Sequence, residues 1–204
     1  SWCDWSSDVC SSDLKEKIGI TGSLGTGKSV VSNYFKKMGH LVISADFINA
    51  ELLNEEDVIL KVNKLLFGED SEYLDKKRIA ELIFSNKEKK KELEDYLHPM
   101  IYAKMKEIID NCDEEIVFLE IPLLFETNFI ELVDYVIVVY ANKTEQIKRI
   151  RKRDGLTKVE AEKRINEQMP IYEKILKADY VIDNNKTIKH TEQQLKEWYE
   201  AFRG

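Results

Sequence analysis

The chain contains little proline, glycine or cysteine. Its 204 residues include 3 prolines, 8 glycines and 3 cysteines. Low proline and glycine content favours a compact, largely helical protein. Cys3, Cys10 and Cys112 do not have the spacing of metal ligands, and nothing about them indicates secretion. No apolar run approaches the roughly 20 residues that span a bilayer, so we expect no membrane partner.

The chain also lacks an excess of basic over acidic residues. It carries a net charge of −7, and 34% of its residues are charged. An acidic chain is a poor candidate for general nucleic-acid binding, so we expect no nucleic-acid partner. This balance is ordinary for a soluble enzyme, and we expect a cytoplasmic location. The sequence does not predict the oligomeric state.

The first fourteen residues differ from the rest in composition. They hold two of the three tryptophans, two of the three cysteines and a near-repeat of Ser-Ser-Asp. They have neither the basic start nor the long apolar core of a signal peptide. We therefore expect residues 1–14 to be extraneous, an artefact or a scar, and residues 15–204 to carry the fold.

The most informative stretch is residues 22–29, which fits the phosphate-loop pattern G-x-x-x-x-G-K-[ST] in full. An apolar segment with Ile18 and Ile20 precedes it, and apolar residues at helical spacing follow it. Glycines let the backbone wrap a phosphate, so that N–H groups and a helix N-terminus point at the anion. Lys28 would add a solvent-facing cation for the phosphates, and Ser29 a hydroxyl ligand for Mg²⁺. The predicted ATP-binding residues are Gly22, Ser23, Leu24, Gly25, Thr26, Gly27, Lys28, Ser29 and Val30.

Short apolar runs alternate with helical patterns along the chain. The runs at 18–21, 41–45, 116–119, 135–140 and 180–182 are typical of buried parallel strands. They predict an α/β fold of the P-loop NTPase kind, with a doubly wound, five-stranded parallel sheet. Two stretches are too long for simple crossovers. We expect a helical acceptor-binding insertion at about 50–112, with helical patterns at 58–67, 78–84 and 100–109, and a helical lid at about 142–177.

Two acidic residues follow predicted strands, where ligands of open α/β sheets bind. Asp46 could accept the proton of an acceptor hydroxyl, and we expect its strand to neighbour the one that leads into the phosphate loop. A helix N-cap is the alternative role for Asp46. Glu120 ends an apolar strand in the manner of a metal-coordinating Walker B carboxylate, so Ser29 and Glu120 are the predicted metal ligands.

The densest basic run lies in the predicted lid and includes Arg149 and Arg153, one helical turn apart. Lid arginines can neutralise charge on a transferring phosphoryl group while the closed lid excludes water. A solvated helix face and an RNA patch are the alternatives. The predicted catalytic residues are Asp46, Lys28, Arg149 and Arg153.

The segment Asn142-Lys143-Thr144-Glu145 is similar to the guanine-specificity motif N-K-x-D of GTPases. Its fourth residue is Glu, however, and no D-x-x-G motif stands between it and the phosphate loop. Asn142 with Glu145 also makes a good capping box, which we favour over a GTPase.

Seven short blocks follow one another from about residue 17 to 185: the phosphate loop, Ser44-Ala45-Asp46, Leu97-His98-Pro99, Pro122-Leu123-Leu124-Phe125-Glu126, Arg153-Asp154-Gly155, Arg164-Ile165-Asn166-Glu167-Gln168-Met169-Pro170 and Ala178-Asp179-Tyr180-Val181-Ile182-Asp183-Asn184. Together, in this order, they resemble the dephospho-CoA kinase family. One departure is Ser44, where family members often carry Asp; Asp46 is retained.

This resemblance implies phosphorylation of the ribose 3′-hydroxyl of dephospho-CoA by ATP with Mg²⁺, the last step of coenzyme A synthesis. It implies that Asp46, Arg78 and His98 help to form the acceptor site, although His98-Pro99 could instead be a helix-start turn. The nearest alternative is another P-loop metabolite or nucleotide kinase. An alternative of another class is a nucleotide-dependent switch without a small acceptor.

Overall fold

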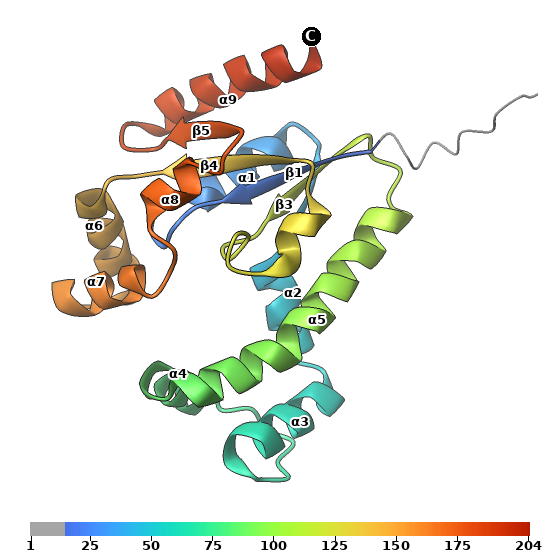
Figure 1. Ribbon diagram of the computed structural model, residues 1–204, viewed down its shortest axis with the longest axis vertical. Coiled ribbons are helices and arrows are strands. Elements are labelled where there is room, and N and C mark those ends of the chain that lie inside the picture. Colours follow the sequence, from blue (N-terminus) through green and yellow to red (C-terminus); the bar gives the residue numbers. More distant parts are fainter. Residues whose placement is uncertain (1–14) are drawn as a thin grey trace, which may run out of the picture. The chain divides into compact units, whose positions relative to one another are not determined.

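The computed structural model describes residues 15–204, so the expectation for residues 1–14 lies outside the described residues. The described chain divides into two compact units (Figure 1). One unit comprises the described residues up to Val42 together with Asp110–Gly204, and the other comprises Ile43–Ile109.

The sheet contains β1 (Glu16–Thr21), β2 (Leu41–Ser44), β3 (Ile116–Glu120), β4 (Tyr135–Tyr140) and β5 (Tyr180–Asp183) in the order β2-β3-β1-β4-β5. β1 pairs in parallel with β3 and β4, and β4 pairs in parallel with β5. The predicted five-stranded α/β sheet is confirmed. The expected neighbour of β1 is wrong, however, because β3 lies between β1 and β2. The crossover from β1 skips one position, which the order of strands along the chain does not reveal.

Helices α1 (Lys28–Lys37) and α9 (Ile188–Arg203) contact the sheet and each other. Their apolar residues join the buried side chains of β1, β3, β4 and β5 in one core. The rings of Phe35 on α1 and Phe118 on β3 stack with centroids 3.8 Å apart. This core packs α1, and with it the loop that precedes α1, against β1 and β3.

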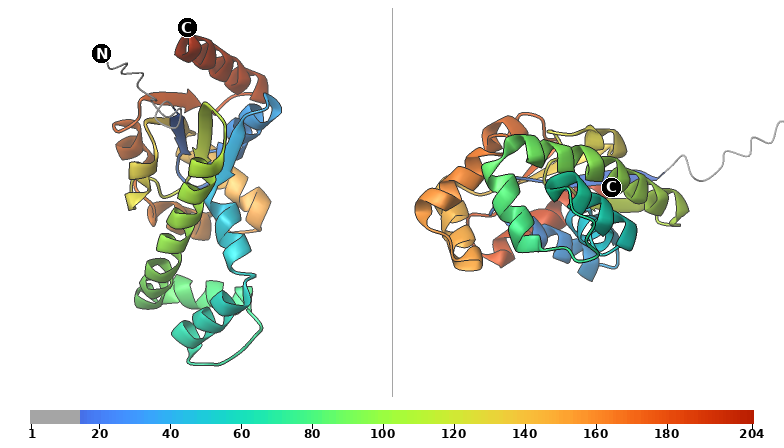
Figure 2. Two further views of the ribbon diagram at one scale, coloured as in Figure 1. Left: turned by 90° about the vertical axis from the view of Figure 1, so that its right-hand side faces the viewer. Right: turned by 90° about the horizontal axis from the view of Figure 1, so that it is seen from below.

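The stretch between β4 and β5 folds into α6 (Lys143–Asp154), α7 (Lys158–Asn166) and α8 (Ile171–Ile175). Thr157 and Glu160 form the predicted capping box at the start of α7. Helices α6 and α7 pack side by side (Figure 2), and α8 contacts β4. The structure also places a short 3₁₀ helix, η2 (Asn128–Leu132), between β3 and β4.

The second unit consists of α2 (Ala45–Leu52), α3 (Glu56–Phe67), α4 (Lys76–Ser85) and most of α5 (Lys87–Asn111). Asp75 caps α4 as predicted, accepting hydrogen bonds from Lys77 N and Arg78 N. Helix α5 is much longer than the predicted 100–109, and Pro99 lies inside it. The alternative of a helix-start turn at His98-Pro99 is therefore wrong. Apolar residues at every fourth position form one buried stripe that continues on both sides of Pro99, and their burial stabilises the helix in spite of the proline. These residues are Leu93, Leu97, Ile101, Met105 and Ile109.

Candidate functional site

The phosphate loop joins β1 to α1, and its glycines adopt backbone conformations that other residues rarely adopt. Gly25 and Gly27 have φ values of 79° and 89°. A Cβ atom on Gly25 would lie 2.8 Å from the carbonyl oxygen of Gln146, and one on Gly27 would clash with the Asn184 amide. The loop therefore needs glycine at these positions both for its backbone conformation and for the close approach of α6 and of the segment after β5.

The Lys28 side chain folds back over the loop. Its Nζ donates hydrogen bonds to the carbonyl oxygens of Gly22 at 3.1 Å and Ser23 at 3.2 Å. The Thr26 hydroxyl donates to Ser23 O at 2.9 Å. The expectation of a solvent-facing Lys28 is wrong, since the side chain is half-buried and contacts these two carbonyls. Its charge is held above the loop.

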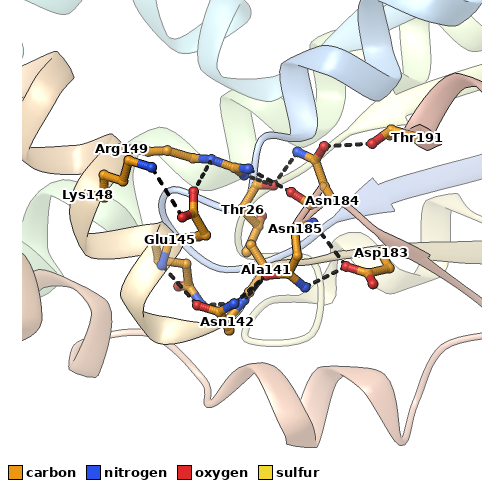
Figure 3. A network of polar contacts seen from close by, with 11 residues as sticks. Thr26, Ala141, Asn142, Glu145, Lys148, Arg149, Asp183, Asn184, Asn185 and Thr191 are labelled. Atoms are coloured by element: carbon orange, nitrogen blue, oxygen red, sulfur yellow. Dashed lines mark hydrogen bonds and ion pairs between the residues drawn. The ribbon is translucent and has the colours of Figure 1, made fainter. Parts of the chain in front are cut away.

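Arg149 and Asn184 converge on the carbonyl oxygen of Thr26 (Figure 3). Arg149 donates to Thr26 O at 3.1 Å and to Asn184 O at 2.6 Å. The buried Asn184 side chain donates to Thr26 O at 2.8 Å and accepts a hydrogen bond from the buried Thr191 hydroxyl at 2.8 Å. The loop, α6 and the segment after β5 are thus joined at one backbone atom.

The start of α6 is fixed by amide side chains. Asn142 caps the helix by accepting from Glu145 N at 2.9 Å, and Asn185 Oδ1 accepts from Asn142 N at 2.8 Å. The Glu145 carboxylate lies 3.4 Å from Lys148 and 3.8 Å from Arg149 (Figure 3). The predicted capping role of the Asn142 side chain is confirmed, but the reciprocal half of the predicted capping box is wrong, because Asn142 N donates to Asn185 rather than to the Glu145 carboxylate. This cap directs α6 so that Arg149 meets the loop.

Arg153 has different partners from Arg149. Its guanidinium forms two hydrogen bonds to the Asp154 carboxylate, at 2.6 and 2.9 Å, and its side chain is 61% exposed. The hydrogen bond from Arg153 lowers the pKa of Asp154 below its usual value. The structure therefore brings Arg149, but not Arg153, onto the phosphate loop.

The other members of the basic run on α6 do not contact the phosphate loop. Lys148, Arg151 and Lys152 help to line a cavity of about 730 Å³ between α6 and α7. All members of the run on α6 except Arg149 are exposed, so the interpretation as a solvated helix face applies to these exposed residues.

The tip of the phosphate loop contacts the segment between α7 and α8. Leu24 N donates to Gln168 Oε1 at 2.8 Å, and the Leu24 side chain packs against a core made by α6 and α7. Gln168 belongs to a family-like block, but sequence reasoning gave it no role. The predicted contact between Leu24 and ATP would use other Leu24 atoms or require this hydrogen bond to open.

The predicted acceptor residues lie in the second unit. Asp46 is exposed in the first turn of α2, and Ser44 caps that helix by accepting from Phe47 N at 3.3 Å. The alternative role of Asp46 as the N-cap is therefore wrong. Asp and Ser are both strong N-cap residues, so the departure from the family pattern at Ser44 keeps a capping side chain.

Arg78 and His98 have defined surroundings within the second unit. Arg78 forms two hydrogen bonds of 2.9 Å to Glu69, and its guanidinium lies 3.8 Å from the centroid of the Phe67 ring. The Glu69 pair raises the pKa of Arg78. His98 is half-buried on α5. The acceptor-binding roles of Asp46, Arg78 and His98 stay predictions.

The two predicted metal ligands stand on α1 and β3. Ser29 is exposed in the first turn of α1, and Glu120 is the half-buried last residue of β3, in register with Ile20 on β1. Within residues 15–204 no three His, Cys, Asp or Glu side chains gather as a possible metal site. A hydroxyl and one carboxylate still fit Mg²⁺, which usually takes one or two protein ligands together with substrate phosphates.

Comparison with known proteins identifies the family. The family model described as dephospho-CoA kinase matches residues 17–190. The chain belongs to the dephospho-CoA kinase family. A dephospho-CoA kinase of Listeria innocua is 38% identical to it over 197 residues, which cover 93% of this chain and 98% of the relative.

Solved structures agree with this assignment to the dephospho-CoA kinase family. Dephospho-CoA kinase from Campylobacter jejuni is similar with a TM-score of 0.68 and 33% identity, over 93% of this chain and 98% of that one. A shikimate kinase from Bacteroides thetaiotaomicron has a TM-score of 0.53 at 16% identity, over 91% of this chain and 98% of that one, which shows a common fold alone. Separately, none of the helices described here is long and apolar enough to span a membrane.

Proposed function

We propose that this chain transfers the γ-phosphoryl group of ATP to the ribose 3′-hydroxyl of dephospho-CoA, giving coenzyme A and ADP. This is the last step of coenzyme A biosynthesis. The observation that carries the proposal is the glycine loop between β1 and α1, with a lysine above it, in a chain of this family. Phosphoryl transfer is catalysed mainly by positioning and by neutralising charge, and such a loop supplies both.

On the ATP side, backbone N–H groups of residues 25–29 and the N-terminus of α1 are suited to bind phosphate oxygens. Lys28 would exchange its contacts with the carbonyls of Gly22 and Ser23 for the β- and γ-phosphates. Arg149 already lies beside the loop and would add a second cation. Arg153 would join it only after leaving Asp154.

Mg²⁺ is the metal we propose, with Ser29 as its ligand from the loop and Glu120 as a weaker candidate. When bound, Mg²⁺ neutralises negative charge on the phosphates. Ser29 is exposed at the start of α1 and is therefore accessible to a hydrated ion that also binds ATP.

On the acceptor side, Asp46 would orient or deprotonate the 3′-hydroxyl. Its exposure and its place directly after β2 support this role, since ligands of open α/β sheets bind beyond the carboxyl ends of the strands. Arg78 and His98 would shape the dephospho-CoA site within the helical insertion. Because Arg78 is held by Glu69 and Phe67, we propose that it presents a fixed surface to the acceptor. The dependence on ATP favours a cytoplasmic location.

An acceptor panel tests the function. Purified protein is incubated with ATP and Mg²⁺ plus dephospho-CoA, AMP or nucleosides, and both ADP and the phosphorylated product are measured. We expect rapid turnover with dephospho-CoA and a product phosphorylated at the 3′ position. Turnover with AMP alone would indicate a nucleotide kinase, and slow hydrolysis that no acceptor accelerates would indicate a nucleotide switch.

A further inference from the structure

Lys174 on α8 is a cation with no exposed side-chain surface. Its Nζ lies 2.9 Å from Glu126 Oε1 and 3.2 Å from Glu126 Oε2, and it donates to the carbonyl oxygen of Pro122 at 2.9 Å. Burying a charge is costly unless it is paired and hydrogen-bonded, and Lys174 has both kinds of partner. The pair joins α8 to the segment that follows β3.

Each partner of Lys174 is hydrogen-bonded to a residue next to the phosphate loop or to the segment that contacts the loop. Pro122 O also accepts a hydrogen bond from the Thr21 hydroxyl at 3.2 Å, and Thr21 is the last residue of β1. Glu126 Oε1 accepts from the backbone N–H of Met169 at 3.1 Å. The Lys174 ammonium is therefore connected to the strand before the loop through Pro122 O and the Thr21 hydroxyl. It is connected to the segment between α7 and α8 through the Glu126 carboxylate and Met169 N.

That segment holds the tip of the loop. Gln168 Oε1 accepts from Leu24 N at 2.8 Å, and the Ser23 hydroxyl donates to Met169 O at 3.5 Å. Leu24 directly precedes Gly25, where the proposed phosphate-binding N–H groups begin. A shift of Gln168 and Met169 would therefore move the loop at the point where it meets phosphate.

Stability alone does not account for a buried ion pair. Well-packed apolar residues of similar volume are often as stabilising as such a pair, whereas removing one partner leaves an uncompensated buried charge. The apolar replacement would, however, lose the acceptor for Met169 N and the donor to Pro122 O. Helix α8 spans only Ile171–Ile175, too short to hold its own position without tertiary contacts.

We propose that Lys174 and Glu126 are positioning residues for phosphoryl transfer, because they hold Gln168 and Met169 against the phosphate loop. Neither residue touches the reacting atoms in this role. The inference rests on the proposed kinase function for its kinetic consequence, but the placement of the loop can be measured without turnover.

Three variants separate positioning from mere stability. Lys174→Met removes the cation and Glu126→Gln removes the anion while keeping an oxygen for Met169 N. The double variant Lys174→Met/Glu126→Met replaces the whole pair with apolar side chains. Lys196→Met is the matched control, because Lys196 forms an exposed ion pair with Glu200 on α9. Each is measured for kcat and KM with dephospho-CoA and ATP, for thermal midpoint, and for hydrogen exchange of the loop amides.

We expect Lys174→Met to lower kcat by about 10- to 100-fold at temperatures where the variant is folded, since misplacement of about an ångström costs this much. The double variant should recover thermal stability relative to Lys174→Met but not kcat. Exchange at Leu24 should accelerate in both. If Lys174→Met does not fold, the kcat and the loop exchange of the double variant and of Glu126→Gln test the proposal instead.

A double variant with parental kcat and parental protection of Leu24 would overturn the proposal and leave the pair a structural role only. The same conclusion follows if Glu126→Gln and Lys174→Met, both folded, match Lys196→Met in every measurement. Failure of the kinase function is distinguishable, because the parent chain would then be inactive with dephospho-CoA while the exchange experiment still reports on the loop.

Discussion

Arg149 donates a hydrogen bond to the carbonyl oxygen of Thr26 at 3.1 Å, across 123 residues of the chain. Its guanidinium also donates to a second backbone carbonyl, that of Asn184, and its Nε forms an ion pair of 3.8 Å with the Glu145 carboxylate. Carbonyl oxygens orient a guanidinium without cancelling its charge, whereas the Glu145 carboxylate compensates part of it. The arrangement therefore places a preorganised, partly paired cation beside the phosphate loop before any substrate binds.

We predict that Arg149→Ala lowers kcat by about 10²-fold or more, because it removes a preorganised cation from the site of developing charge. Arg149→Lys should recover only part of the rate, since lysine lacks the planar fork that meets two carbonyls at once. Steady-state kinetics with ATP and dephospho-CoA measure both. Arg151→Ala, an exposed arginine on the same helix, is the control and should keep the parental rate. A parental rate in Arg149→Ala would exclude a catalytic role.

Lys28→Ala should abolish most of the turnover while the protein stays folded. The ammonium would neutralise charge that grows during transfer, so the loss should appear mainly in kcat, at about 10²-fold or more. The side chain also bridges two loop carbonyls, Gly22 O and Ser23 O, so the variant loop should be less protected against hydrogen exchange. Equal kcat in variant and parent would refute the assignment of the phosphate loop.

Arg149 and Arg153 on α6 differ in their partners, and a pair of variants can test the role of Arg153. If Arg153 leaves Asp154 to bind a transferring phosphoryl group, Arg153→Ala should slow the transfer far more than it weakens dephospho-CoA binding. Asp154→Asn weakens the same ion pair but keeps the arginine, so it should leave kcat near the parental value. Presteady-state phosphoryl transfer and equilibrium binding of dephospho-CoA measure the two effects. Equal losses in both variants would show that Arg153 acts only through its pair with Asp154.

Much of the fold was predictable from local sequence signals. The buried strands are runs of β-branched and apolar residues, and the phosphate loop carries its glycines and lysine in a fixed order. Caps such as Asp75 and Thr157 act within a few residues, so they could be predicted from spacing alone. These features depend on short-range chemistry.

The features that the sequence did not predict depend on long-range packing. The strand order places β3 between β1 and β2, although β2 follows β1 in the chain. Lys174 belongs to a residue type that is rarely buried. It is nevertheless buried here, with partners, Glu126 and Pro122, that are 48 and 52 residues away in the chain. Arg149 and Arg153 share a helical face by spacing, but Arg153 has Asp154 as a nearer partner.

The catalytic role of Asp46 stays a prediction, because one argument for it is wrong and one alternative to it is excluded. The strand before Asp46 does not neighbour β1, and Ser44 rather than Asp46 caps the helix. What remains is an exposed carboxylate in the first turn of α2, directly beyond the end of β2. With the cap supplied by Ser44, the main structural contribution of Asp46 is its favourable charge near a helix N-terminus, worth about 0.3–1 kcal/mol.

Asp46→Asn should therefore change the thermal midpoint little, while kcat falls by about 10²–10⁴-fold and ATP affinity stays nearly unchanged. Glu51→Gln, an exposed carboxylate later on the same helix, is the matched control and should leave kcat at the parental value. In the proposed role as a base, the carboxylate would orient the acceptor hydroxyl and accept its proton, whereas an amide of the same size could only orient it. Measuring kcat, ATP affinity and thermal midpoint for both variants separates chemistry from helix stability. A loss of kcat smaller than about fivefold would fall well short of general-base catalysis and would leave Asp46 with only its helix-terminal charge effect.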